Sequence, residues 1–130
     1  MKKLFRKLFP NKEQRAYHKM HRRHRKELIK HAKETGEWDW GWLHDSIIMQ
    51  IRHMHEYYTA GNNVWQTDET RLPIIEQLKH ILDMAEEIDN FYNNNDVRDF
   101  EGFEQFEAKE QALYDELYSS IGRDLRYWWD

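Results

Sequence analysis

Lysine and arginine residues recur at helical spacing near the start of the chain, and they predict a surface that binds negatively charged molecules. The candidate polyanion-binding residues are Arg15, Lys19, Arg22, Arg23, Lys26, Lys30 and Lys33. On a helix that rises 1.5 Å per residue, the distance from Arg15 to Lys33 is about 27 Å. Cations in such a row neutralise successive phosphates of RNA or DNA and release counterions, which gives strong but non-specific binding.

Three other interpretations of this basic stretch stay open beside nucleic acid. It could dock on an acidic protein surface, including the acidic part of its own chain, or it could remain solvated. It could also contact an anionic membrane, because residues 4–9 mix leucine and phenylalanine with basic residues. Pro10 separates that short segment from the longer basic stretch, so we favour nucleic acid as the partner.

Tryptophan is concentrated in two short stretches that could dock on a partner. The candidate docking residues are Trp38, Trp40, Trp42, Trp128 and Trp129. Exposed indole rings stack on bases or anchor a partner protein. The alternative, which we favour at this point, is that these large rings fill the ends of a small helical core.

The remaining reactive residue types predict neither catalysis nor a bound metal or cofactor. The chain has no cysteine, which removes thiolate ligands and a thiol nucleophile. No glycine-rich phosphate loop is present in the sequence. The residue order of an HD-type metal phosphohydrolase is matched by His18, then His44 and Asp45, then Asp83 or Asp89. A match of two adjacent residues is common by chance, so we expect a non-catalytic protein and keep this enzyme as the alternative.

Charge is divided unevenly along the chain. Residues 1–33 carry thirteen Lys and Arg against two Glu, whereas residues 34–130 carry seven Lys and Arg against twenty-two Asp and Glu. This asymmetry predicts a basic N-terminal arm over residues 1–35 and an acidic helical body over residues 36–130.

Residue usage and periodicity predict an all-α fold, a bundle of three or four helices with a basic N-terminal helix. Only two Val and four Thr occur, and 34% of the residues are charged, which disfavours strands. Helix caps and apolar periodicity place the helices at residues 11–35, 39–60, 67–93 and 98–120. We expect the third helix to be the most buried, and short connections to make neighbouring helices antiparallel.

The apolar positions of these helices identify an expected core. Its members are Leu43, Ile47, Ile51, Ile75, Leu78, Leu82, Leu113 and Leu117. No apolar run is long enough to cross a membrane, and the first ten residues lack the apolar length of a signal peptide. These features predict a cytoplasmic protein.

The chain resembles small helical proteins encoded by tailed bacteriophages. The resemblance rests on Trp38-Asp39-Trp40, on Met54 and Tyr57-Tyr58, on the Leu/Ile helix from Leu78 to Ile88, and on the closing Arg126-Tyr127-Trp128-Trp129-Asp130. It covers residues 38–130 and leaves the basic arm outside. It implies a phage protein that acts in the bacterial cytoplasm or is carried in the virion, and it transfers no activity and no functional residues.

Small phage proteins of this kind often bind a host or phage macromolecule without catalysis, which leads to two alternative functions. One is a counter-defence or host-takeover protein that binds a host protein or sequesters a signalling nucleotide. The acidic body could imitate nucleic acid, and aromatic and basic residues could trap a nucleotide. The other is a structural component of the virion.

Overall fold

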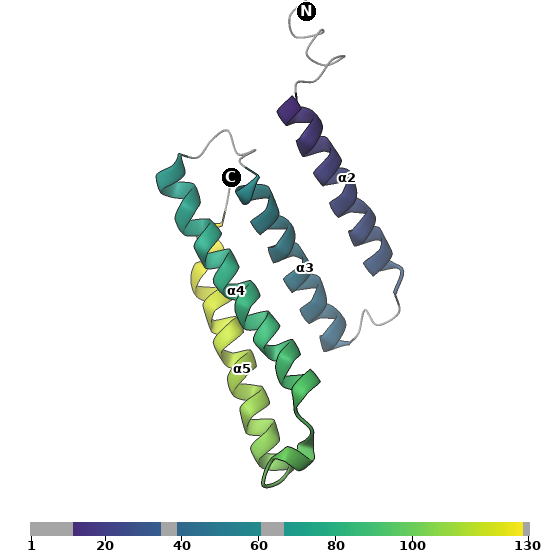
Figure 1. Cartoon of the computed structure of the whole chain (residues 1–130), viewed down its shortest axis with the longest axis vertical. Coiled ribbons are helices and arrows are strands. Elements are labelled where there is room, and N and C mark those ends of the chain that lie inside the picture. Colours follow the sequence, from purple (N-terminus) through teal and green to yellow (C-terminus); the bar gives the residue numbers. More distant parts are fainter. Residues whose placement is uncertain (1–11, 35–38, 61–66, 129–130) are drawn as a thin grey trace, which may run out of the picture. The chain divides into compact units, whose positions relative to one another are not determined.

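The computed structural model of the 130-residue chain describes residues 12–34, 39–60 and 67–128. Within these ranges the chain forms helices and no strand (Figure 1). The helices are α2 (Lys12–Ala32), α3 (Trp40–Thr59), α4 (Asp68–Asn94), the 3₁₀ helix η1 (Val97–Asp99), α5 (Phe103–Asp124) and the 3₁₀ helix η2 (Leu125–Tyr127). The predicted all-α bundle class is confirmed.

The first three predicted helices agree with the observed ones to within three residues at each end. The fourth, predicted at 98–120, instead runs from Phe103 to Asp124. Gly122, which we expected to lie beyond the helix, is inside α5, and the chain continues directly into η2.

The connection between α4 and α5 explains why α5 begins late. The backbone amide of Asp96 donates to the Asp99 carboxylate at 2.6 Å, and the amide of Glu101 donates to Oε1 of Gln105 at 2.7 Å. Such side-chain bonds give the backbone an alternative to helical hydrogen bonds. Gly102 precedes the helix with a φ of 146°, which residues with a side chain rarely adopt.

Two glycine-to-alanine substitutions should therefore have opposite effects on the free energy of unfolding. Gly102→Ala should destabilise the protein by about 1–3 kcal/mol, because a side chain is strained at this φ. Gly122→Ala should stabilise it by about 0.5–1 kcal/mol, since an added Cβ meets no atom within 4 Å and the residue is helical. Urea denaturation measures both, and effects of the same sign would contradict this account.

The chain divides into two compact units, Met1–Ile47 and Ile48–Asp130. The first contains α2 and the first two turns of α3, and the second contains the rest of α3 together with α4 and α5. The division that we expected from charge, 1–35 and 36–130, stays a prediction, because its boundary falls among residues 35–38, outside the described residues.

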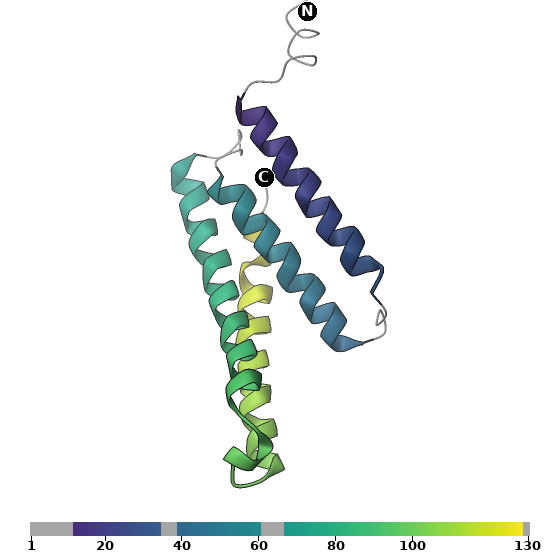
Figure 2. The ribbon, with the colours of Figure 1, turned by 45° about the vertical axis from the view of Figure 1, so that its right-hand side comes forward.

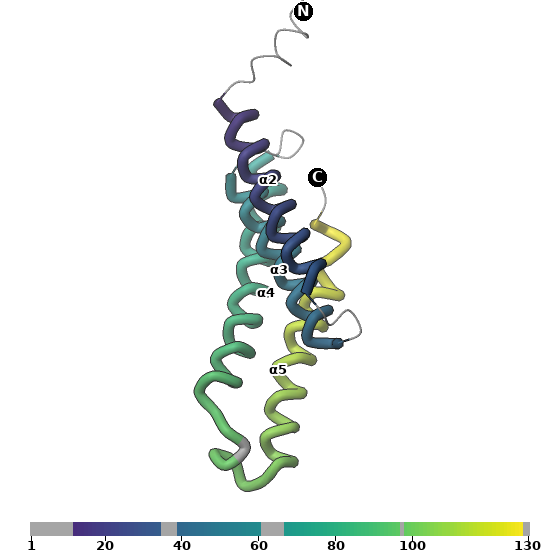
Figure 3. Tube along the Cα trace, turned by 90° about the vertical axis from the view of Figure 1, so that its right-hand side faces the viewer, coloured from purple at the N-terminus to yellow at the C-terminus, as the bar shows by residue number. Residues whose placement is uncertain are grey.

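The core of the second unit lies between α4 and α5, which pack as antiparallel neighbours (Figures 1 and 3). Four side chains here are fully buried: Leu78, Ile81 and Ile88 of α4 and Leu117 of α5. Burying an aliphatic side chain of this size contributes about 1.5–3 kcal/mol. The prediction that the third helix is the most buried is confirmed, because α4 carries seven buried residues against five in α5.

The expected core is correct in part. Four of its members are buried: Ile51, Leu78, Leu113 and Leu117. Three are only half-buried: Ile47, Ile75 and Leu82. On α4 the buried line passes through Ile74, Ile81 and Ile88, which places Ile75 and Leu82 at its edge. The assignment of Leu43 to the core is wrong, because this side chain is 57% exposed.

Burial on two opposite sides of α3 explains the error at Leu43. His44, Ile51 and Tyr58 recur every seven residues on one side and are buried. The opposite side carries four buried or half-buried side chains: Trp42, Ser46, Met49 and His53. Leu43 points between the two sides. A helix buried on both sides has no single apolar stripe, so periodicity alone could not identify its exposed edges.

Aromatic rings close the turn end of the α4–α5 hairpin. The ring centroid of Phe91 lies 5.0 Å from that of Phe106 and 5.9 Å from that of Phe100. The Tyr92 hydroxyl donates to the Glu110 carboxylate at 2.8 Å and lies 3.3 Å from the Tyr114 hydroxyl. Partial burial and these hydrogen bonds raise the pKa of Tyr92, so its phenol stays neutral at physiological pH.

Candidate nucleic-acid interface

Helix α2 exposes all seven of the predicted polyanion-binding residues. Six lie within the helix, and Lys33 follows it. The backbone amide of Lys33 donates to the carbonyls of Ile29 and Lys30, each at 3.2 Å, so the turn after Ala32 keeps the helical path. The predicted residues therefore lie along one continuous helical segment, α2 and the turn after it. Figure 2 shows the path of this helix.

Six of these cations form a continuous line, which we call the basic row: Arg15, Lys19, Arg22, Lys26, Lys30 and Lys33. Successive members are three or four residues apart, which places a cation every 4.5–6 Å, at about 1.5 Å per residue. The two acidic residues of α2, Glu13 and Glu27, lie outside the row. At about 100° per residue, Glu13 is about 100° and Glu27 about 60° around the helix from Lys30, the member of the row nearest to them in angle. Within the described residues, no member of the basic row forms an ion pair.

The opposite side of α2 has a different character. Met20 and His24 are buried there. Tyr17, half-buried, stacks on His21 with 5.9 Å between ring centroids and an interplanar angle of 7°. The helix therefore separates a buried side from a charged, exposed side.

His31 and Trp42 hold the last turn of α2 against the first turns of α3. Their rings stack with centroids 4.6 Å apart and an interplanar angle of 7°. The indole Nε1–H of Trp42 donates to the backbone carbonyl of His31 at 3.3 Å. Nε2 of His31 lies 2.7 Å from the Ser46 hydroxyl. We call these three residues the α2–α3 clasp, and it positions the C-terminal end of the basic row.

Beside the α2–α3 clasp, the structure also places a carboxylate, an imidazole and a hydroxyl next to one another, an arrangement that sequence reasoning missed. Nδ1 of His31 is 3.5 Å from the Glu34 carboxylate, and Nε2 is 2.7 Å from Ser46, so acid, base and hydroxyl stand in sequence. The residues come from two helices, and no motif spacing relates them. Catalysis by such a set requires a base that faces the hydroxyl proton and donors for the oxyanion.

Neither requirement is favoured by the surroundings of Ser46. Its hydroxyl donates to the backbone carbonyl of Trp42 at 2.7 Å, so its lone pairs face His31 and accept a hydrogen from Nε2. Ser46 lies inside α3, where backbone amides are used in helical hydrogen bonds and cannot form an oxyanion hole. This arrangement supports a structural role for the clasp.

Removing the indole from the clasp should loosen the first unit. We expect Trp42→Ala to cost about 1–3 kcal/mol, because it removes the ring stack and a hydrogen bond at a half-buried site. The matched control is Trp40→Ala, since Trp40 is 63% exposed. Amide hydrogen exchange should accelerate at residues 28–33 and 42–47 in the Trp42 variant alone. Equal exchange in the two variants would show that the stack contributes nothing.

The candidate docking tryptophans differ in their surroundings. Trp40 is exposed, so its docking role stays a prediction, whereas Trp42 is engaged in the α2–α3 clasp. Trp38 and Trp129 lie outside the described residues. The docking assignment of Trp128 is wrong, because the residue is 6% exposed and its indole N–H donates to Oε1 of Gln77 at 3.0 Å.

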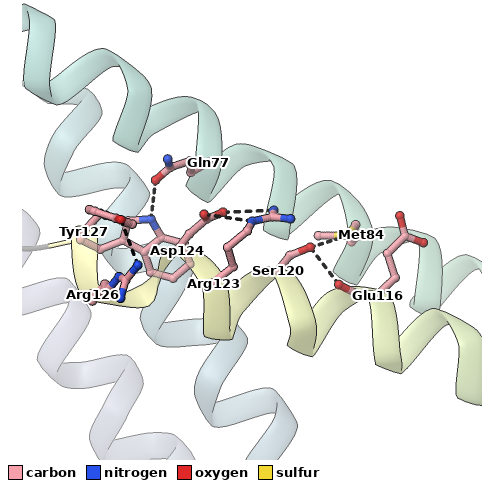
Figure 4. Close-up of polar contacts among 9 residues, drawn as sticks. Gln77, Met84, Glu116, Ser120, Arg123, Asp124, Arg126 and Tyr127 are labelled. Atoms are coloured by element: carbon pink, nitrogen blue, oxygen red, sulfur yellow. Dashed lines mark hydrogen bonds and ion pairs between the residues drawn. The ribbon is translucent and has the colours of Figure 1, made fainter.

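Polar contacts link Trp128 and the last turns of α5 to α4 (Figure 4). Gln77 supplies the acceptor for the buried indole of Trp128. Asp124 is buried at the end of α5, and Nε of Arg123 lies 3.3 Å from its carboxylate, which partners the charge. The Ser120 hydroxyl donates to the carbonyl of Glu116 at 2.8 Å. Each buried polar group at this end of α5 therefore has a partner, as burial demands.

The residues of the alternative enzyme are not arranged as a metal centre in the part of the chain that the structure describes. His44 is buried, whereas Asp45 is exposed on another side of α3. Across residues 12–34, 39–60 and 67–128, no group of three or more His, Cys, Asp or Glu side chains is placed to hold a metal ion. Among the same residues, no helix combines the length and apolar character needed to cross a membrane.

Comparisons of the chain with protein families, with curated proteins and with solved structures found no match. The resemblance to bacteriophage proteins therefore stays a prediction from the sequence.

Proposed function

We propose that this chain is a non-catalytic binding protein whose helix α2 contacts nucleic acid. The observation that carries the proposal is the basic row: six exposed cations, five on α2 and Lys33 in the turn that follows it, without an ion pair in the described residues. On the resemblance alone, we propose that the setting is a bacteriophage infection, in which the protein acts as an accessory factor.

Binding of the basic row to phosphates would carry a small free-energy cost. Cations that already have internal partners must give them up before they neutralise phosphates, whereas members of the basic row have none to lose among the described residues. The helix is also formed before the partner arrives, so ordering costs little entropy. Six phosphate contacts on duplex DNA give a slope of log affinity against log salt of about −5.

Docking on an acidic protein surface is the main competing function. Between Asp83 and Glu116 the sequence carries twelve carboxylates against two cations, which makes the α4–α5 hairpin strongly acidic. Such a surface could neutralise a basic helix or imitate nucleic acid toward a host protein. Its acidic residues are mostly exposed, so this alternative also has a structural basis.

Binding measured across a salt series separates these functions. The intact chain should bind a fluorescent oligonucleotide, with affinity falling about a thousandfold or more between about 50 and 200 mM salt. Fluorescence anisotropy reports the affinity directly. Absence of binding even at the lowest salt would reject the nucleic-acid function and favour docking on protein.

A further inference from the structure

The basic row belongs to a wider cationic surface of α2. Arg25 is exposed on one flank of the row and Lys30 on the other, about 140° apart around the axis at about 100° per residue. Arg15 and Lys33 lie between these flanks. We call this surface, the basic row with Arg23 and Arg25, the cationic arc. Arg23 lies about 20° beyond Lys30, so the arc spans about 160° of the circumference of the helix.

We propose that α2 binds duplex DNA by lying in the major groove, an inference that rests on the proposed function. The major groove of B-DNA is about 12 Å wide, and a helix with its side chains is about 10–12 Å in diameter. Phosphates line both walls of the groove. A single line of cations would reach one wall, whereas the two flanks of the cationic arc reach both.

The length of the basic row and the orientation of the cationic arc also fit the major groove. The row of about 27 Å matches about eight base pairs at 3.4 Å per pair. In the α2–α3 clasp, the side chain from α2 is His31, which lies about 160° around the helix from Arg15 and Lys33. The cationic arc therefore points away from the first turns of α3.

Duplex RNA and single strands fit this surface less well. The major groove of A-form RNA is too deep and narrow for side chains to read. Single-strand binding depends on aromatic rings that stack on bases within the charged surface. The described residues of the cationic arc include no phenylalanine, tyrosine or tryptophan, and Tyr17 lies on the other side of α2, stacked on His21. The cations of the arc are assigned to phosphates, which carry no sequence information, so we expect weak sequence preference.

The experiment uses the full chain with three probes of about 20 nucleotides per strand: duplex DNA, duplex RNA of the same sequence, and single-stranded DNA. Anisotropy at about 0.1 M salt should give an affinity for duplex DNA at least about tenfold above the other two. Dimethyl sulfate should show protection of guanine N7, in the major groove, and none of adenine N3, in the minor groove. Heparin serves as a polyanion without a groove.

A pair of substitutions, one on each flank, tests the geometry. Arg25→Gln with Lys30→Gln should reduce duplex affinity about tenfold or more and lower the magnitude of the salt slope by about two. The matched control, Lys79→Gln with Lys109→Gln, removes the same charge from exposed positions on α4 and α5 and should leave affinity within about twofold.

The outcomes separate the two proposals. Equal affinity for duplex DNA and duplex RNA, or guanine N7 left unprotected, overturns major-groove binding while the polyanion function stands. Equal losses from the flank pair and the control pair also overturn it. Failure to bind all three oligonucleotides and heparin overturns both the inference and the proposed function.

Discussion

Replacement of all six residues of the basic row by glutamine is expected to weaken binding to duplex DNA about a thousandfold at low salt. Each lost phosphate contact removes about one released counterion. The magnitude of the slope of log affinity against log salt should therefore fall by about five. Glutamine forms helix about as well as lysine and arginine, so α2 should persist. Circular dichroism checks the helix, and anisotropy over a salt series measures the affinity.

The control for this variant removes two negative charges from α2 instead of six positive ones. Glu13→Gln with Glu27→Gln raises the net charge of α2 and keeps all six members of the basic row, so it should strengthen binding slightly without changing the number of phosphates contacted. If the salt slope of the six-residue variant changes by less than about two, the phosphate contacts lie elsewhere on the chain.

Truncation of one leucine in the α4–α5 core should have the largest effect on stability. Leu78 has no exposed surface, so Leu78→Ala is expected to cost about 2–5 kcal/mol through lost burial and a residual cavity. Leu72→Ala is the matched control, the same change on the same helix at a side chain that is 53% exposed. Its effect should stay within about 0.5 kcal/mol.

Urea denaturation measures both leucine variants in parallel. The midpoint should fall for Leu78→Ala with little change in the denaturant dependence, because the native fold is kept. Similar losses from the two variants would contradict the assignment of the buried side of α4. Nucleic-acid affinity should be unchanged in both where the protein is folded, since neither residue lies in α2.

The elements of the fold were largely predictable, because helix periodicity depends on neighbouring residues. Three helices were located closely from caps and spacing. The start of α5 was missed because Gln105 and Asp99 bind backbone amides, a contact that no periodicity records. Leu43 was misplaced because burial on two sides of α3 is a property of packing.

The candidate site, like the fold, could be predicted from the sequence only in part. The basic row could be predicted, because the pitch of a helix fixes which of its residues share a side. The clasp could not, since His31 and Ser46 lie fifteen positions apart in the chain and meet only when two helices pack. Docking stayed open beside the favoured packing of Trp128, because sequence alone could not identify the acceptor of its indole, Gln77.

The preformed state of α2 has a consequence for the speed of encounter with a polyanion. A charged rod that needs no folding step can associate at electrostatically steered rates of about 10⁸–10⁹ M⁻¹s⁻¹ at low salt. Contacts made to phosphates alone are equivalent at every step along a duplex, so dissociation from one position and capture at the next cost little. On DNA, such a helix would translocate by diffusion along the polymer, and residence at any single position would be short.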